Sequence, residues 1–193
     1  MWNHLTSYRE IIDELHNASD RTLAIIGSAL VENYLTDAIK RRLRQHANAA
    51  NQLFQPTGAV GAFRSKVCLG FLMGIYEESI FDDLNRVATM RNDFAHKAEP
   101  LKFETPKIAS QCSALSIVEP QVVSLHSEKR FTGTGLVTET PAISPARMWL
   151  VVPDAKAVLQ SPRLRFEAAL QLLCFGLQDE IFPLRHDHPV KPA

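Results

Sequence analysis

The sequence lacks an excess of charge of either sign, and this absence argues against one class of protein. Lysine and arginine together number 21, as do aspartate and glutamate, so the formal net charge is zero. A protein that binds nucleic acid mainly through phosphates usually carries a basic excess. Direct DNA binding is therefore not expected, although a local basic patch such as KRRLR, Lys40–Arg44, stays open.

Cysteine pairs, targeting signals and long apolar runs are also missing. The three cysteines are dispersed and form no CxxC motif, which favours a reducing compartment and a role as small core residues. The N-terminal stretch MWNHLTSYREIIDEL is charged throughout and is not a secretory signal. The longest apolar runs reach about ten residues, whereas a membrane-spanning helix needs about 20. The sequence predicts a cytoplasmic protein, with no membrane segment and no metal or cofactor motif.

Helix breakers are scarce in the first third of the chain. Between Trp2 and Gln55 there is no proline, and Gly27 is the one glycine. Apolar residues at steps of three and four, with Ser19 or Asp20 as N-cap, predict a long amphipathic helix to about Arg44. The face consists of Leu23, Ile26, Leu30 and Tyr34. A shorter helix around Ile11, Ile12 and Leu15 precedes it.

The rest of the chain alternates breakers with helical patterns. We expect a loop over His46–Phe63 and then a buried central helix, because Ser65–Tyr76 is apolar on nearly all sides. Gly70 and Gly74 would share one face of that helix. The next helix would start near Asp82 or Asp83 and stop before Pro100.

Two Ser/Thr–Pro pairs, Thr105–Pro106 and Ser161–Pro162, each predict an N-cap followed by proline at the first helical position. The last helix would bury the face of Phe166, Ala169, Leu170, Leu173 and Leu177. The β-prone runs VVSL, GLVT and MWLVV predict a small strand-bearing insertion at about 116–160. The fold class expected is all-α, a single domain over residues 1–193 with a bundle of five to six helices.

The hexapeptide RNDFAH, Arg91–His96, is the main candidate for chemistry. On a helical wheel Arg91 falls within the apolar stripe of Leu84, Val87, Ala88, Phe94 and Ala95. A buried guanidinium keeps its charge and needs acceptors, and Glu32 and Asp37 are the candidate partners. If the helix continues, His96 lies about 140° around from Arg91, so the two would converge only if the chain turned or across a symmetric dimer.

Two interpretations of this hexapeptide stay open. In metal-independent RNA cleavage, His96 would transfer a proton, Arg91 would stabilise the charged transition state, and Asn92 would position the phosphate. Lys66 could then serve as a phosphate ligand, or could extend to the surface instead. In the structural interpretation, Arg91 pairs with a core acid, Asn92 faces solvent and His96 caps the last carbonyl groups.

Three blocks of the sequence resemble the MltR-like family, the mannitol operon repressor-like proteins. They are SDRTLAIIGSALVENYL, LFQPTGAVGAFRSKVCLGFLMGIY and FDDLNRVATMRNDFAHKAEPLKFETPKI, between about residues 19 and 118, and SPRLRFEAALQLL resumes the match. The resemblance implies an all-helical core, a cytoplasmic location and a role in transcriptional regulation without a recognised DNA-binding motif. RNDFAH also resembles the Arg-x4-6-His signature of HEPN domains, which include ribonucleases that act at dimer interfaces.

From these observations we expect a homodimeric regulatory protein that acts through a protein partner. The alternative is a HEPN-type endoribonuclease acting on RNA, with Arg91, Asn92 and His96 as its catalytic residues.

Overall fold

The computed structural model describes residues 2–119 and 155–179, and these two ranges contain helices and no strand. The all-α prediction is confirmed for them. In chain order the helices are α1 (Trp2–Asn17), α2 (Asp20–Thr22), the π-helical segment η1 (Leu23–Gly27), α3 (Ser28–Arg42), α4 (Ala47–Phe54), α5 (Phe63–Leu72), α6 (Glu78–His96), α7 (Pro106–Ser113), α9 (Ala155–Gln160) and α10 (Pro162–Asp179). None of them is long and apolar enough to cross a membrane, as far as the described residues go.

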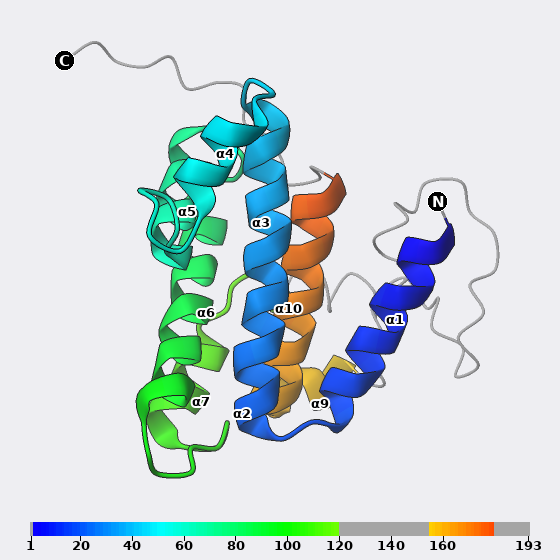
Figure 1. Cartoon of the computed structure of the whole chain (residues 1–193). Helices are drawn as coiled ribbons and strands as arrows, with labels where there is room; N and C mark the ends of the chain where they lie inside the picture. The colour runs from blue at the N-terminus through cyan, green and yellow to red at the C-terminus, as the bar shows by residue number, and fades with distance from the viewer. Residues whose placement is uncertain (1, 120–154, 180–193) are drawn as a thin grey trace.

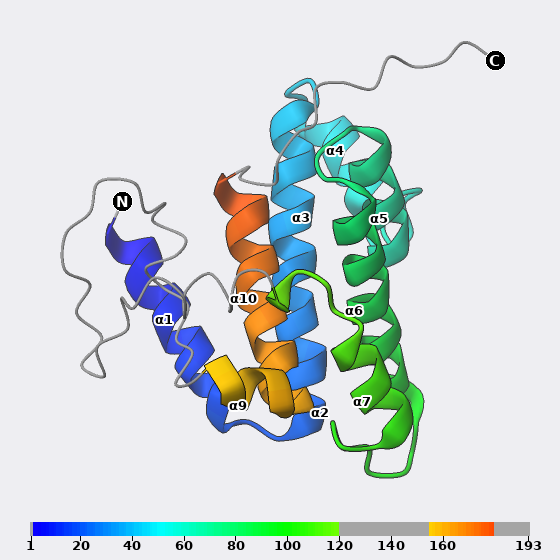
Figure 2. The same ribbon diagram turned by 180° about the vertical axis from the view of Figure 1, so that it is seen from behind.

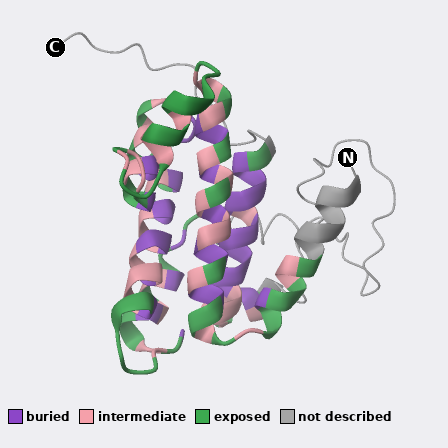
Figure 3. Cartoon of the chain, in the orientation of Figure 1, coloured by how far each residue is buried: buried purple, intermediate pink, exposed green. Residues whose placement is uncertain are grey.

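The helices α3 and α10 lie side by side at the centre of the bundle (Figure 1). The hairpin of α5 and α6, together with α7, packs on one side of this pair, while α1 leans away on the other (Figure 2). Figure 3 shows that buried residues concentrate on α10 and on the inward faces of its neighbours. The predicted face of the last helix is confirmed, since all five of its residues are buried: Phe166, Ala169, Leu170, Leu173 and Leu177.

Several helix boundaries follow from local sequence signals. The Ser19 hydroxyl accepts a hydrogen bond from the Thr22 N–H, so Ser19 is the predicted N-cap. Prolines open α7 and α10 as expected. The Ser161 hydroxyl accepts from the Leu164 N–H. Thr105 occupies the predicted N-cap position of α7, but its hydroxyl accepts from the preceding Lys102 N–H and makes no hydrogen bond to the first turn of the helix.

Other boundary predictions were wrong. The expected loop at His46–Phe63 contains α4, which the His46 ring caps by accepting from the Ala49 N–H. Helix α6 begins at Glu78, earlier than predicted, although its end at His96 falls before Pro100 as expected. Of the predicted insertion at 116–160, residues 120–154 with all three β-prone runs lie outside the described residues, and residues 155–160 form helix α9.

The helix α5 is not the buried centre that its composition predicted. Its outer face is open, and Leu72 is 82% exposed. The helix ends in a Schellman motif: Gly74, with φ +66°, donates to Phe71 and Ile75 donates to Gly70. Gly74 therefore lies beyond the helix and shares no face with Gly70, where an added Cβ would lie 2.6 Å from the Tyr76 hydroxyl oxygen.

The basic run KRRLR caps neighbouring helices. The Arg41 guanidinium donates to the carbonyl oxygens of Leu177 and Gln178 near the end of α10. The Arg42 guanidinium donates to the Gly74 carbonyl oxygen after α5. Two arginines of the run therefore interact with the negative ends of packed helices. Their role in the described structure is to join helices.

The carboxylate of Asp83 joins α6 to the chain that follows α7. Asp83 is 0% exposed and accepts hydrogen bonds from the Ser116 N–H, the Ser116 hydroxyl and the Ile117 N–H. Arg86, one turn away, donates to the same carboxylate at 3.0 Å. Four donors make burial of this charge favourable, because each replaces a lost contact with water.

We therefore expect Asp83→Ala to destabilise the fold by roughly 2 to 4 kcal/mol, since it leaves buried N–H groups without an acceptor. Asp82→Ala is the matched control, because the Asp82 side chain is 54% exposed and its carboxylate lies 3.9 Å from Arg86. It should cost less than about 0.5 kcal/mol. Urea unfolding followed by circular dichroism measures both, and equal losses in the two variants would contradict the role assigned to Asp83.

Candidate functional site

The apolar stripe predicted for α6 is largely present. Its members Leu84, Val87, Ala88 and Phe94 are buried, while Ala95 is exposed. Arg91 lies within this stripe and is only half-buried.

The predicted pairing of Arg91 with an acid of α3 was wrong. The Arg91 guanidinium donates to the Asn92 side-chain oxygen at 3.2 Å, and within the described residues it forms no ion pair. Asp37 is exposed. Arg91 lies in an apolar stripe without a carboxylate partner because it is only half-buried. A guanidinium that still reaches water does not need a carboxylate.

Glu32 is instead the partner of Lys66. The Lys66 Nζ lies 2.5 Å from the Glu32 Oε1, and the side chains of Lys66 and Glu32 are 9% and 18% exposed. The pair joins α3 to α5. Lys66 is thus neither a surface lysine nor a ligand poised for phosphate, because its ammonium group is already neutralised in the interior.

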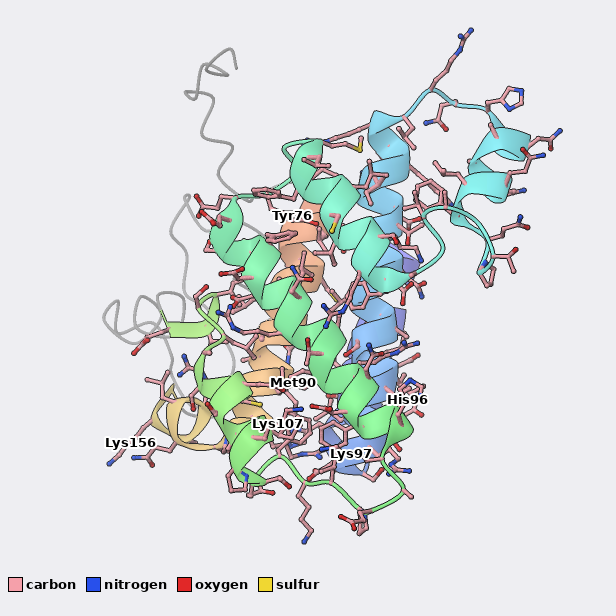
Figure 4. The ribbon with its side chains drawn as sticks, turned by 90° about the vertical axis from the view of Figure 1, so that its left-hand side faces the viewer. Tyr76, Met90, His96, Lys97, Lys107 and Lys156 are labelled. Atoms are coloured by element: carbon pink, nitrogen blue, oxygen red, sulfur yellow. The ribbon has the colours of Figure 1, made fainter. Side chains whose placement is uncertain are left out.

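His96 is the last residue of α6 and is exposed (Figure 4). The helix is continuous from Arg91 to His96, so their side chains leave it about 140° apart. A single chain therefore does not bring Arg91 and His96 onto one face. The last turn of α6 closes through the Lys97 N–H and the Asp93 carbonyl oxygen, and in the described part of the chain no hydrogen bond from His96 caps it.

The acidic member of the hexapeptide has a structural contact. The Asp93 carboxylate lies 2.8 Å from the Lys107 Nζ, which links α6 to α7. In Figure 4, Lys107 on α7 and His96 at the end of α6 lie on different sides of the lower part of α6. RNDFAH thus serves partly as a packing segment: Phe94 enters the core and Asp93 fixes the neighbouring helix.

An open pocket lies beside this helix end, between the start of α2 and the α6–α7 loop. Its volume is about 560 Å³, and it is lined by Ser19, Asp20, Arg21, Ala98, Pro100, Leu101, Lys102 and Glu104. Arg21 donates to the carbonyl oxygens of Lys97 and Glu99, and the Asp20 carboxylate accepts from the Phe103 N–H. Both charged side chains hold the loop in place, and Arg91, Asn92 and His96 do not line the pocket.

The buried cysteines are unsuited to nucleophilic chemistry. Burial raises the pKa of the Cys112 thiol to about 12, with smaller opposing effects of Arg165 and Glu104, and burial also raises the pKa of Cys174. Both thiols stay protonated at neutral pH, and the thiolate is the reactive form. No cluster of three potential metal ligands occurs within residues 2–119 and 155–179.

Sequence reasoning missed the buried polar residues outside the hexapeptide. Asp83, Arg165, Glu167 and Gln171 are all buried. Nothing local distinguishes Asp83 from the exposed Asp82 beside it, apart from its place at the border of the α6 stripe. Two of them, Asp83 and Arg165, bind the same stretch of chain after α7, since Asp83 accepts from Ser116 and Ile117 and Arg165 donates to the Leu115 carbonyl oxygen.

Comparison with solved structures shows a similarity of fold. No family model and no curated protein matches the sequence. The fold is similar to that of a chain in the X-ray structure of the MtlR–HPr complex from Escherichia coli, with a TM-score of 0.59 and 16% sequence identity. The similarity covers 88% of this chain and 96% of that chain. At this identity it shows a shared MtlR-like fold, and the HEPN resemblance of RNDFAH stays a prediction.

Because Lys66 is buried, Glu32→Ala should destabilise the protein by roughly 3 kcal/mol through its unpaired charge. Asp37→Ala, on the exposed face of the same helix, should cost less than about 0.5 kcal/mol. The double variant Glu32→Met with Lys66→Met should recover most of the loss, since it removes both charges. Thermal and urea unfolding test all three, and a double variant as unstable as Glu32→Ala would show that packing, not charge, is responsible.

Proposed function

We propose that this chain is an MtlR-type regulatory protein that acts by binding another protein. The observation that carries the proposal is the extent of the shared fold. The similarity covers 88% of this chain and 96% of the matching chain in the MtlR–HPr complex. That structure is a complex of two proteins. A protein like HPr is therefore the first partner class to test for this chain.

The charge distribution supports a protein partner over DNA. The net charge is zero, and Arg41 and Arg42 of the most basic run donate to backbone carbonyl groups. A DNA-binding surface needs cations that are free to contact phosphates. We infer that any effect on transcription is exerted through the bound protein.

The geometry of a single chain does not support a role as an endoribonuclease. Arg91 and His96 diverge around a continuous helix, so a shared active site would need two copies. This alternative remains testable because His96 is exposed at a helix end and can be replaced with little effect on packing.

The first experiment is isothermal titration of the full chain with purified HPr from the same organism. We expect saturable and reversible binding of one HPr per chain. Reversibility is expected because a regulatory contact must form and dissociate as conditions change. An unrelated protein of similar size and charge is the control. Failure to bind at concentrations up to roughly 100 µM, equivalent to about −5.5 kcal/mol, would rule out HPr as the partner.

The second experiment incubates varied RNAs with the wild type and His96→Ala, without added metal. We expect no cleavage by either protein and similar melting temperatures. Asn92→Ala is a second variant from the same hexapeptide. Cleavage by the wild type that disappears in a stably folded His96→Ala would instead make Arg91–His96 a catalytic segment and overturn a purely regulatory role.

A further inference from the structure

The outward face of α5 is apolar, although the helix lies at the edge of the bundle. Cys68 and Leu72 are exposed one turn apart, and Phe71 beside them is half-buried. The Phe71 ring lies 4.7 Å from the ring of Phe81 on α6, which extends the apolar surface onto the next helix. We call these four residues the α5 strip.

The α5 strip differs from the apolar surface elsewhere in the described chain. A helix at the edge of a bundle normally places polar residues outward, and one that is apolar all round is normally buried. Leu72 is 82% exposed. Among the described residues, the other large hydrophobic side chain that is exposed belongs to Ile26, which is 50% exposed and lies in η1. A contiguous apolar surface of this kind is typical of a protein contact.

The charges at the two ends of the strip have opposite signs. Arg64 is exposed one turn before Cys68. Because α5 and α6 run antiparallel, with Arg64 bonded to Thr89 and Phe71 stacked on Phe81, the start of α6 lies at the other end. That end carries three exposed carboxylates, Glu77, Glu78 and Asp82.

This arrangement is complementary to itself. When a surface with one cationic and one anionic end is rotated by 180° about its middle, each end meets the opposite charge of its copy. We propose that a second copy of this chain covers the α5 strip. The two α5 helices pack antiparallel about a two-fold axis near Cys68 and Leu72, and Arg64 of each copy faces the acidic end of the other.

The proposal is independent of HPr binding, because it concerns contact between copies. Sedimentation velocity of the full chain between about 1 and 100 µM should show a dimer, with dissociation as the protein is diluted. Leu72→Glu should weaken the dimer at least tenfold, because it places two carboxylates at the centre of the apolar contact. Ile26→Glu is the matched control and should leave the association unchanged.

Charge reversal tests the orientation. Arg64→Glu and Glu78→Arg should each weaken the dimer severalfold, since like charges then face each other. The double variant should recover it, because the pairs re-form with exchanged signs. Circular dichroism melts confirm that each variant is folded. Single variants that leave association unchanged, or a double variant that fails to recover it, would exclude the antiparallel arrangement.

Cross-linking tests the position of the axis. Cys68 is exposed, whereas Cys112 and Cys174 are buried, so a short bis-maleimide reacts with one thiol per chain in the native protein. We expect a covalent dimer from the wild type, and a monomer from Cys68→Ser and from Leu72→Glu.

Three results would overturn the proposal. One is a wild type that stays monomeric at about 100 µM. Another is a dimer that Leu72→Glu does not weaken, since the contact then lies elsewhere. The third is a monomeric wild type whose binding to HPr is lost in Leu72→Glu, which would assign the α5 strip to the protein partner.

Discussion

The packing of the bundle depends on the ion pair between Arg163 at the start of α10 and Asp20 at the start of α2. The Arg163 Nη1 lies 2.5 Å from the Asp20 Oδ1, and the Arg163 Nη2 donates to the backbone oxygens of His16 and Ala18 at the end of α1. One guanidinium thus binds a carboxylate and caps a helix, with rigid donor geometry that a lysine could not reproduce. Glu167, one turn along, lies 3.2 Å from Arg163 and 2.8 Å from the His16 ring. The contact thus ties the end of α1 and the start of α2 to the first turn of α10.

The same constraint positions the region around RNDFAH. The second oxygen of Asp20 accepts from the Phe103 N–H, and the neighbouring Arg21 holds the chain just after α6. The α6–α7 loop is therefore fixed by backbone contacts, and α6 keeps its helical geometry through His96. A helix that does not bend there cannot bring a histidine back to an arginine five residues earlier. Within one chain the straight helix therefore keeps Arg91 and His96 apart.

A shared fold carries less information about function than a shared site does. The similarity to a chain of the MtlR–HPr complex shows the fold, whereas the surface that meets any partner depends on individual side chains. In this chain the conspicuous surface is the α5 strip, whose apolar centre and oppositely charged ends favour a second copy.

The sequence by itself determined the features that depend on neighbours along the chain. Apolar residues at steps of three and four predicted helices over α3, α6 and α10, because helical side chains three and four apart lie on one face. The face predicted for the first of them was only partly right, since Ile26 is 50% exposed. Ser19, Pro106 and Pro162 marked helix starts, because capping and the fixed proline φ are local effects. Only the tertiary structure decided which charges meet: Lys66 with Glu32, and Asp83 with the backbone after α7. It also decided that apolar α5 lies at the edge while α10 takes the centre. Such choices depend on how whole helices pack, and segments of similar composition can occupy either place.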